Sequence, residues 1–202
     1  MKCLLWTVAV GALGAFIAAG GPADAQISQN GPYYATPSWD QKLPASTRFI
    51  VLTDWNSAAV LDRETGLVWE RAPGGPGNPF ISPVPWVGPA GIFPLKNALG
   101  FCRAAHIGDR FGWRLPTEEE LSTLVDPTIN TEPNLPPGNP FQGVSTLNGD
   151  IFWTASQFES DDTLAYAVSF DPQGIPPVLF PKTDSFRTWC VRGGSTVSNS
   201  PY

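Results

Sequence analysis

The sequence predicts an α+β domain in which two short helices pack on small antiparallel β-sheets joined by long irregular loops. Short β-rich runs bounded by turn residues recur along the chain, which is typical of antiparallel sheets. Only the stretches 95–106 and 118–125 have the apolar spacing of helices. The composition agrees, because 22 prolines and 20 glycines among 202 residues favour loops over a helical bundle.

The strands are expected to alternate with turns in chain order. Residues 59–62 and 67–70 flank a turn at 63–66, in which Gly66 is placed to take a positive φ, and this pattern indicates a hairpin. The full set of expected strands is 48–52, 59–62, 67–70, 151–156, 165–170, 177–180 and 188–192.

The second helix has a well-marked start. Thr117 is a candidate N-cap, and Glu120, three residues later, completes a capping box. The glutamates at 118–120 suit the positive end of the helix dipole and are expected to face solvent. Gly108 is a plausible stop for the first helix.

The first 25 residues have the features of a secretory signal peptide. Lys2 supplies a positive start, residues 4–19 form an apolar run, and residues 23–25 form a small-residue cleavage site. A membrane anchor is the alternative, but the run is short for a bilayer span, which needs about 20 apolar residues. We therefore expect export to the periplasm, the cell surface or the medium, with no transmembrane segment after cleavage.

Cleavage would leave one domain of ordinary size. Residues 26–47 lack periodicity and are predicted to be a flexible leader, residues 48–194 the folded domain, and residues 195–202 a disordered tail. The net charge of −6 opposes attraction to phosphate, so no nucleic-acid partner is expected.

The stretch 72–94 is predicted to be an unusual loop. Six prolines and five glycines lie between Ala72 and Pro94, and they exclude a regular element over most of the stretch. Its large apolar residues include Phe80, Trp86 and Phe93, which are the candidate binding surface. The alternative is that Trp86 and Phe93 fold back and cover the core.

Two cysteines, Cys102 and Cys190, remain after signal cleavage. In an exported chain this even number predicts one disulfide between a middle and a C-terminal element. Closing so long a loop stabilises a fold by about 4 to 5 kcal/mol in the chain-entropy model. A reactive thiol is the alternative, and it would need a reducing compartment.

Five stretches carry motifs in a recognisable order: 62–69, 112–117, 124–128, 152–156 and 190–194. Together they resemble the Lcl C-terminal domain family, named for the C-terminal domain of a bacterial collagen-like adhesin. The family is similar to the C-type-lectin-like superfamily, so the resemblance implies that fold. In that superfamily a cysteine on the first helix pairs with one on the last strand, an arrangement that Cys102 and Cys190 match.

The tryptophans within these motifs are expected to be structural. Trp69, Trp113, Trp153 and Trp189 lie in predicted strands or beside the helix start, where a large indole suits the core. Arg114 is expected to bind loop carbonyls or an acidic residue rather than a ligand.

No catalytic, metal or cofactor site is predicted. The tripeptide at 132–134 resembles a calcium-lectin motif but precedes the strand it would have to follow, and the acidic loop at 159–162 lacks regular ligand spacing. His106 is the only histidine, and spacing assigns no nucleophile to it. The resemblance of 114–121 to formylglycine-generating enzymes implies no such activity, because those enzymes hold copper with two C-terminal cysteines.

These observations together predict an exported, non-catalytic binding or adhesion module. The resemblance implies surface recognition, with sulfated glycans among the family precedents, but the acidic charge favours a protein or a neutral glycan. The alternative is a structural or assembly component of the bacterial envelope that uses the loop at 72–94. An enzyme of the formylglycine-generating type is the third hypothesis.

Overall fold

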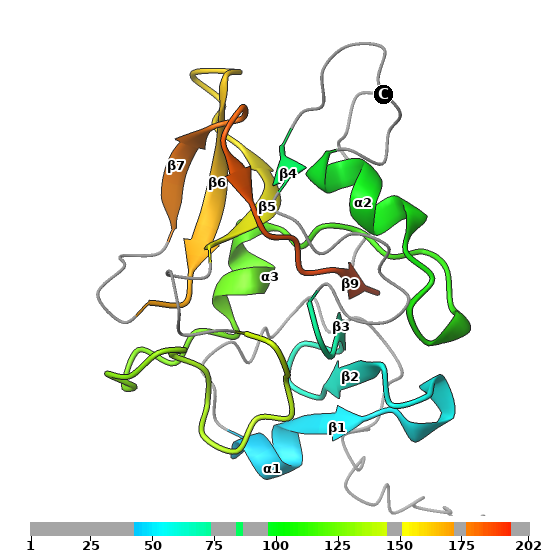
Figure 1. Cartoon of the computed structure of the whole chain (residues 1–202). Coiled ribbons are helices and arrows are strands. Elements are labelled where there is room, and N and C mark those ends of the chain that lie inside the picture. Colours follow the sequence, from blue (N-terminus) through cyan, green and yellow to red (C-terminus); the bar gives the residue numbers. More distant parts are fainter. Residues whose placement is uncertain (1–42, 74–83, 87–96, 145–150, 172–176, 195–202) are drawn as a thin grey trace, which may run out of the picture. The chain divides into compact units, whose positions relative to one another are not determined.

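The computed structural model describes residues 43–73, 84–86, 97–144, 151–171 and 177–194. Within these residues, short helices and three small antiparallel sheets confirm the predicted α+β class (Figure 1). The predicted signal peptide, most of the predicted leader and the predicted tail lie outside the described residues. No helix in the described ranges is long and apolar enough to cross a membrane.

The first sheet contains the predicted hairpin. Four strands pair antiparallel in the order β1 (Phe49–Val51), β2 (Ala59–Asp62), β3 (Val68–Glu70) and β9 (Val191–Arg192). Gly66 in the hairpin turn has φ +70°, a conformation that glycine adopts without steric cost. Because β9 pairs with β3, the C-terminal strand completes a sheet that the N-terminal strands begin.

The remaining strands form two further sheets. The larger sheet has the order β5 (Ile151–Gln157), β6 (Leu164–Ser169) and β7 (Val178–Pro181), and the smaller pairs β4 (Val84–Pro85) with β8 (Ser185–Phe186). The sequence does not predict β4 or β8, because two residues are too few to show an alternating pattern.

The predicted last strand at 188–192 is wrong in extent, since β9 contains only Val191–Arg192. The segment before it crosses between two sheets. Arg187 forms an isolated bridge with Phe152 of β5, whereas the Cys190 carbonyl accepts a hydrogen bond of 2.9 Å from the Glu70 amide next to β3. The segment therefore cannot pair with one neighbour along its whole length.

The helices are shorter than predicted. They are α1 (Ala45–Arg48), α2 (Ala98–Ala104) and α3 (Glu118–Ser122), with 3-10 turns η1 (Thr53–Trp55) and η3 (Ile107–Asp109). Asn97 has extended backbone angles, and its side chain accepts a hydrogen bond from the Gly100 amide at 2.7 Å. This cap sets the start of α2 later than the predicted residue 95. Gly108 lies in η3, beyond the end of the helix.

At the N-terminal end of the domain, α1 corrects the predicted leader boundary at residue 47. The α1 helix includes residues 45–47, and its Arg48 side chain is fully buried. Arg48 donates two hydrogen bonds to Asp62, at 2.9 and 2.7 Å, and one of 3.0 Å to the Thr123 carbonyl. The Arg48 Nε atom also lies 3.2 Å from a Glu64 oxygen. These contacts join α1 to the hairpin and to the end of α3.

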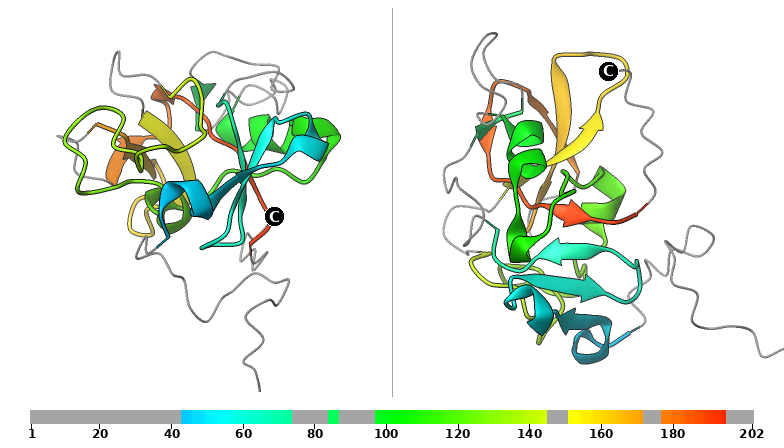
Figure 2. Two further views of the ribbon diagram at one scale, coloured as in Figure 1. Left: turned by 90° about the horizontal axis from the view of Figure 1, so that it is seen from below. Right: turned by 90° about the vertical axis from the view of Figure 1, so that its right-hand side faces the viewer.

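The core contains the four tryptophans of the sequence motifs. Trp69, Trp153 and Trp189 are 0% exposed and Trp113 is 2% exposed. Their indole groups meet aromatic neighbours edge-on or tilted, as in the contact of 6.0 Å between the ring centroids of Trp69 and Trp189. In the views of Figures 1 and 2, α3 lies between the β5–β6–β7 sheet and the β1–β2–β3–β9 sheet.

Candidate functional site

The structure places one of the three candidate surface aromatics in the core. Trp86 is 4% exposed, and its indole N–H donates a hydrogen bond of 2.8 Å to the Thr154 carbonyl. The Lys182 ammonium lies 4.6 Å from the centre of the Trp86 ring. The prediction of Trp86 as a binding residue is therefore wrong, and it covers the core instead. Phe80 and Phe93 lie outside the described residues.

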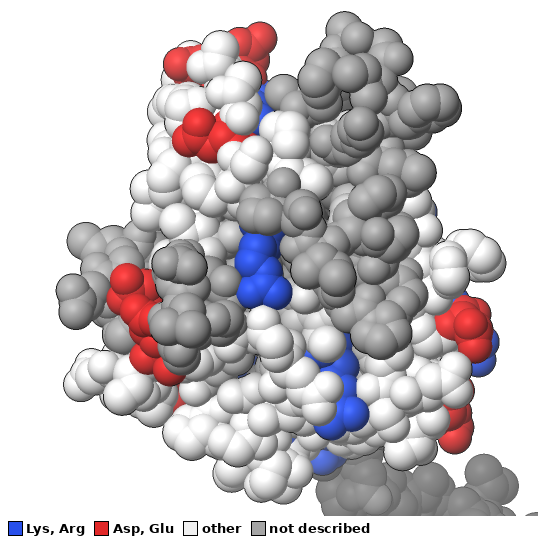
Figure 3. Space-filling view, viewed as in Figure 1, with Lys and Arg blue, Asp and Glu red and all other residues white. Residues whose placement is uncertain are grey.

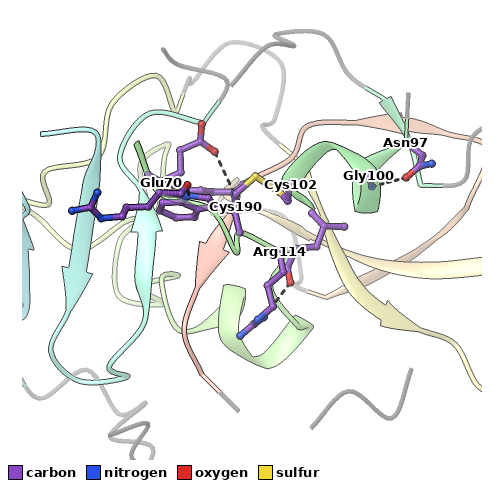
Figure 4. Close-up of a disulfide and its surroundings, with 10 residues drawn as sticks. Glu70, Asn97, Gly100, Cys102, Arg114 and Cys190 are labelled. Carbon is purple, nitrogen blue, oxygen red and sulfur yellow. Dashed lines mark hydrogen bonds between the residues drawn. A yellow bond between two sulfur atoms is a disulfide. The ribbon is translucent and has the colours of Figure 1, made fainter. Parts of the chain in front are cut away.

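The predicted disulfide is confirmed. Cys102 of α2 is bonded to Cys190, which directly precedes β9, and both residues are fully buried. Figure 4 shows the bond beside Glu70, whose Oε2 atom accepts a hydrogen bond of 3.3 Å from the Cys190 amide. The bond closes a sequence separation of 88 residues and fixes α2 against the first sheet.

The start of α3 is a structural corner. Thr117 Oγ1 accepts a hydrogen bond of 3.2 Å from the Glu120 amide, and Glu120 Oε2 accepts one of 2.9 Å from the Thr117 amide, so the predicted capping box is present. Arg114 donates two hydrogen bonds of 2.7 Å to Glu120 and a third of 2.7 Å to the Gly193 carbonyl. The expectation that all three glutamates face solvent is wrong for Glu120, because Arg114 and the cap hold its carboxylate.

A cleft of about 520 Å³ opens where η1 meets η3. Its walls come from four separate parts of the chain: Asn56, Ser57, Ala58, Glu70, Arg71, Ala72, His106, Ile107, Gly108, Asp109 and Gln142. Gly108 has φ +61°, and a Cβ atom built on it would lie 2.8 Å from Trp55 Cβ. Only glycine therefore allows η3 to approach η1 this closely.

Hydrogen bonds hold the polar walls of the cleft in place. Arg71 donates to the Pro140 carbonyl at 3.1 Å and to the Ser57 carbonyl at 3.3 Å. The Asn56 side chain donates to Asp109 Oδ2 at 3.1 Å. Arg71, Asn56 and Asp109 are thus held in place, and Gln142 and His106 add an amide and an imidazole to the walls. Sequence reasoning missed this site because no spacing links its four segments, and Gly108 gave the only local signal.

The cleft contains no evident arrangement for nucleophilic catalysis among the described residues. His106 is exposed, and its ring packs against Phe111 with the centroids 6.1 Å apart. No hydrogen bond joins His106 to a described serine, and the two described cysteines are bonded to each other. The arrangement is suited to contacts with polar groups of a ligand.

The two loops considered for calcium have structural contacts. Asn134 is buried, its amide donates to the Phe170 carbonyl at 3.1 Å, and its carbonyl accepts from the Asp126 amide at 2.7 Å. Asp161 Oδ1 accepts hydrogen bonds from the amide and hydroxyl of Thr163, at 2.9 and 2.6 Å. In the part of the chain that the structure describes, no three His, Cys, Asp or Glu side chains are grouped to hold a metal ion.

Two carboxyl groups away from the cleft have displaced pKa values. Burial raises the pKa of Glu118, and the charge of neighbouring Glu119 raises it further. Hydrogen bonds from the Thr163 hydroxyl and amide lower the pKa of Asp161, with a smaller contribution from Lys182. On the face in Figure 3, the described charged side chains form small separate groups rather than one extended basic surface.

Comparison with known proteins gives one match. The family model of the Lcl C-terminal domain matches residues 58–192, which is most of the described region. No curated protein and no solved structure matches the chain. The match contains the hairpin, the disulfide, the α3 corner and the cleft walls from Ala58 to Gln142. The chain therefore belongs to the Lcl C-terminal domain family.

Proposed function

We propose that the chain is an exported, non-catalytic binding module whose cleft holds a neutral, hydroxyl-rich ligand such as a glycan unit. The observation that carries this proposal is the cleft at the η1–η3 junction, with its fixed polar walls. Ligand sites are concave and use a few placed polar groups to orient what they bind. Amides such as Asn56 and Gln142 can both donate to and accept from a sugar hydroxyl.

The charges of the cleft favour a neutral ligand. Two carboxylates, Glu70 and Asp109, line it together with one guanidinium group, that of Arg71. Arg71 is already engaged with two backbone carbonyls, so it has less capacity to neutralise an anion. The net charge of −6 adds long-range repulsion of sulfated polymers.

The disulfide supports both the exported location and the absence of formylglycine-generating activity. A buried disulfide persists in an oxidising compartment, which agrees with the predicted signal peptide. It also occupies Cys190, the one C-terminal cysteine, so the copper ligands of that enzyme type are not available. The bond joins α2 to the segment before β9, and this position supports membership of the C-type-lectin-like superfamily.

The envelope-assembly hypothesis depends on the loop at 72–94. Residues 74–83 and 87–96 lie outside the described residues, and Trp86 is buried. Among the described residues of this loop, none favours assembly over ligand binding, so our proposal rests on the cleft.

The test is a screen of the wild-type protein against an array of neutral and sulfated oligosaccharides, followed by calorimetric titration. We expect binding to a neutral glycan. The Gln142→Ala variant should bind that glycan about two- to tenfold more weakly, as expected for the loss of one neutral hydrogen bond.

Asn130→Ala is the matched control for this titration. It removes an exposed amide that is not part of the cleft wall, so it should bind as the wild type does. Flat responses to every neutral glycan, or binding to sulfated glycans alone, would show that the proposal is wrong.

A further inference from the structure

A second surface lies beside the cleft and is formed by residues of η1, of the segment just after η3, and of β9. The Trp55 ring of η1 has two guanidinium groups against it, with Arg110 Cζ at 5.4 Å and Arg192 Cζ at 5.2 Å from the ring centre. Phe111, next to Arg110, is 72% exposed. We call Trp55, Arg110, Phe111 and Arg192 the Trp55 surface; none of them lines the cleft.

The Trp55 surface is held by the core beneath it. The Trp55 ring meets the buried Trp113 ring edge-on, with centroids 6.3 Å apart. The Trp113 indole in turn donates a hydrogen bond of 2.7 Å to the Arg110 carbonyl. Arg192 belongs to β9, whose position the first sheet fixes. Trp55, Arg110 and Arg192 are therefore brought together by three separate parts of the fold: η1, the residue that follows η3, and β9.

The two arginines of this surface, unlike Arg48 and Arg114, have no acidic partner among the described residues. Neither guanidinium lies within 4.0 Å of a carboxylate of any described residue, and Arg110 donates only to the neighbouring Asp109 carbonyl, at 3.3 Å. The Asp109 carboxylate accepts from Asn56, and Asp54 on η1 pairs with neither arginine.

The chain has 18 acidic and 12 basic residues, yet no described carboxylate pairs with either arginine of the Trp55 surface. Both guanidinium groups lie near the same indole, and each can engage a carboxylate through bidentate hydrogen bonds. The charge at this point is complementary to a local anion, although the chain as a whole is acidic.

We propose that the Trp55 surface docks a short acidic segment of a partner protein, with carboxylates on Arg110 and Arg192 and an apolar side chain against Phe111. Trp, Phe and Arg are enriched at the centres of protein interfaces. A protein segment fits better than a long anionic glycan, because it presents a few carboxylates without carrying a continuous charge past an acidic domain.

The test is fluorescence anisotropy with a labelled peptide in which Glu alternates with Phe and Leu. The wild-type protein should bind this peptide, and a peptide with Gln in place of Glu should bind at least about tenfold more weakly, since charge-assisted hydrogen bonds are lost. Affinity for the Glu peptide should also fall as salt is raised.

Three variants separate the contributions of the surface. Arg110→Gln with Arg192→Gln should weaken binding of the Glu peptide by at least about tenfold. The corresponding Lys pair keeps the charge without the planar fork, and its affinity should fall in between. Phe111→Ser removes a side chain that is 72% exposed, so the fold should persist while affinity falls.

Arg103→Gln is the matched control, since Arg103 is an exposed arginine of α2 outside the surface, and it should bind like the wild type. Neutral-glycan binding should be unchanged in the Arg110 and Arg192 variants, and peptide binding should be unchanged in Gln142→Ala. The two sets of variants therefore test this proposal and the cleft proposal independently. Three outcomes would each overturn the proposal. They are no binding of the Glu peptide by the wild type, wild-type affinity for that peptide in the Arg110→Gln, Arg192→Gln double variant, and binding of a sulfated oligosaccharide but of no peptide at the surface.

Discussion

The α1–hairpin junction and the Trp55 surface use the same side chain in opposite ways. At the junction, the buried Arg48 guanidinium is matched by Asp62, Glu64 and a backbone carbonyl. At the Trp55 surface, Arg110 and Arg192 contact an aromatic ring and no carboxylate of a described residue. Arg48 thus stabilises the fold through buried ion pairs, whereas we propose that Arg110 and Arg192 bind a partner.

Removal of the paired arginine, Arg48, should cost the fold the most stability. Arg48→Met should leave the Asp62 carboxylate buried without its cation, at 0% exposure. Loss of one partner from a buried pair typically reduces the free energy of unfolding by about 3 to 5 kcal/mol. Equilibrium urea unfolding, followed by tryptophan fluorescence, measures this change.

A double variant tests whether the stranded Asp62 charge causes this loss. Adding Asp62→Leu to Arg48→Met removes the stranded charge, so part of the lost stability should return. Arg103→Met is the control, because this side chain is exposed and should contribute less than about 0.5 kcal/mol. A loss below about 1 kcal/mol in Arg48→Met would show that the pair does not hold the junction.

The junction of η1 and η3 provides a second, smaller test. Gly108→Ala would place a Cβ atom 2.8 Å from Trp55 Cβ and 2.9 Å from the Trp55 carbonyl oxygen. We expect a loss of about 1 to 3 kcal/mol, the usual effect of overpacking, and weaker binding of the acidic peptide because Trp55 must move. Urea unfolding and peptide anisotropy of the same sample measure both effects.

Gly138→Ala is the control for this substitution. Gly138 also has a positive φ, +79°, but a Cβ atom there would meet no atom within 4 Å. Its effect therefore reports backbone strain alone, and the difference between the two variants reports the contact with Trp55. Equal losses in both variants would show that η3 can move away from η1 without consequence.

The sequence predicts the parts of this molecule whose partners are close along the chain. Thr117 and Glu120 are three residues apart, so their capping box is visible in the sequence alone. The hairpin has the same advantage, because residues 63–66 form its turn.

The parts that sequence reasoning missed depend on contacts between distant segments. The cleft joins Asn56, Arg71, His106 and Gln142, and the Trp55 surface joins η1 to β9, more than 130 residues later. Trp86 shows the same limit, since its indole partner, the Thr154 carbonyl, lies 68 residues away. No local pattern contains the information that these residues meet.

Glu118 of α3 carries a charge that its surroundings disfavour, and its effect on stability should be small. Burial and the neighbouring Glu119 raise the pKa of Glu118, so the folded state holds this proton more tightly than the unfolded chain does. As pH rises from the ordinary value of 4.5 through the raised value, the ionised carboxylate lowers the stability of the fold. Relative to the wild type, Glu118→Gln should therefore gain stability over this window and keep the gain above it. The gain should stay below about 0.5 kcal/mol because solvent screens a partly exposed charge.

Urea unfolding from pH 4 to pH 7 measures this gain. Glu119→Gln is the control, because it removes only the second cause of the pKa shift, the neighbouring charge. If the stability gain of Glu118→Gln over the wild type shrank as pH rose, the sign of this pKa shift would be contradicted. The Glu118 carboxylate would then be stabilised by the fold, as the Asp62 carboxylate is.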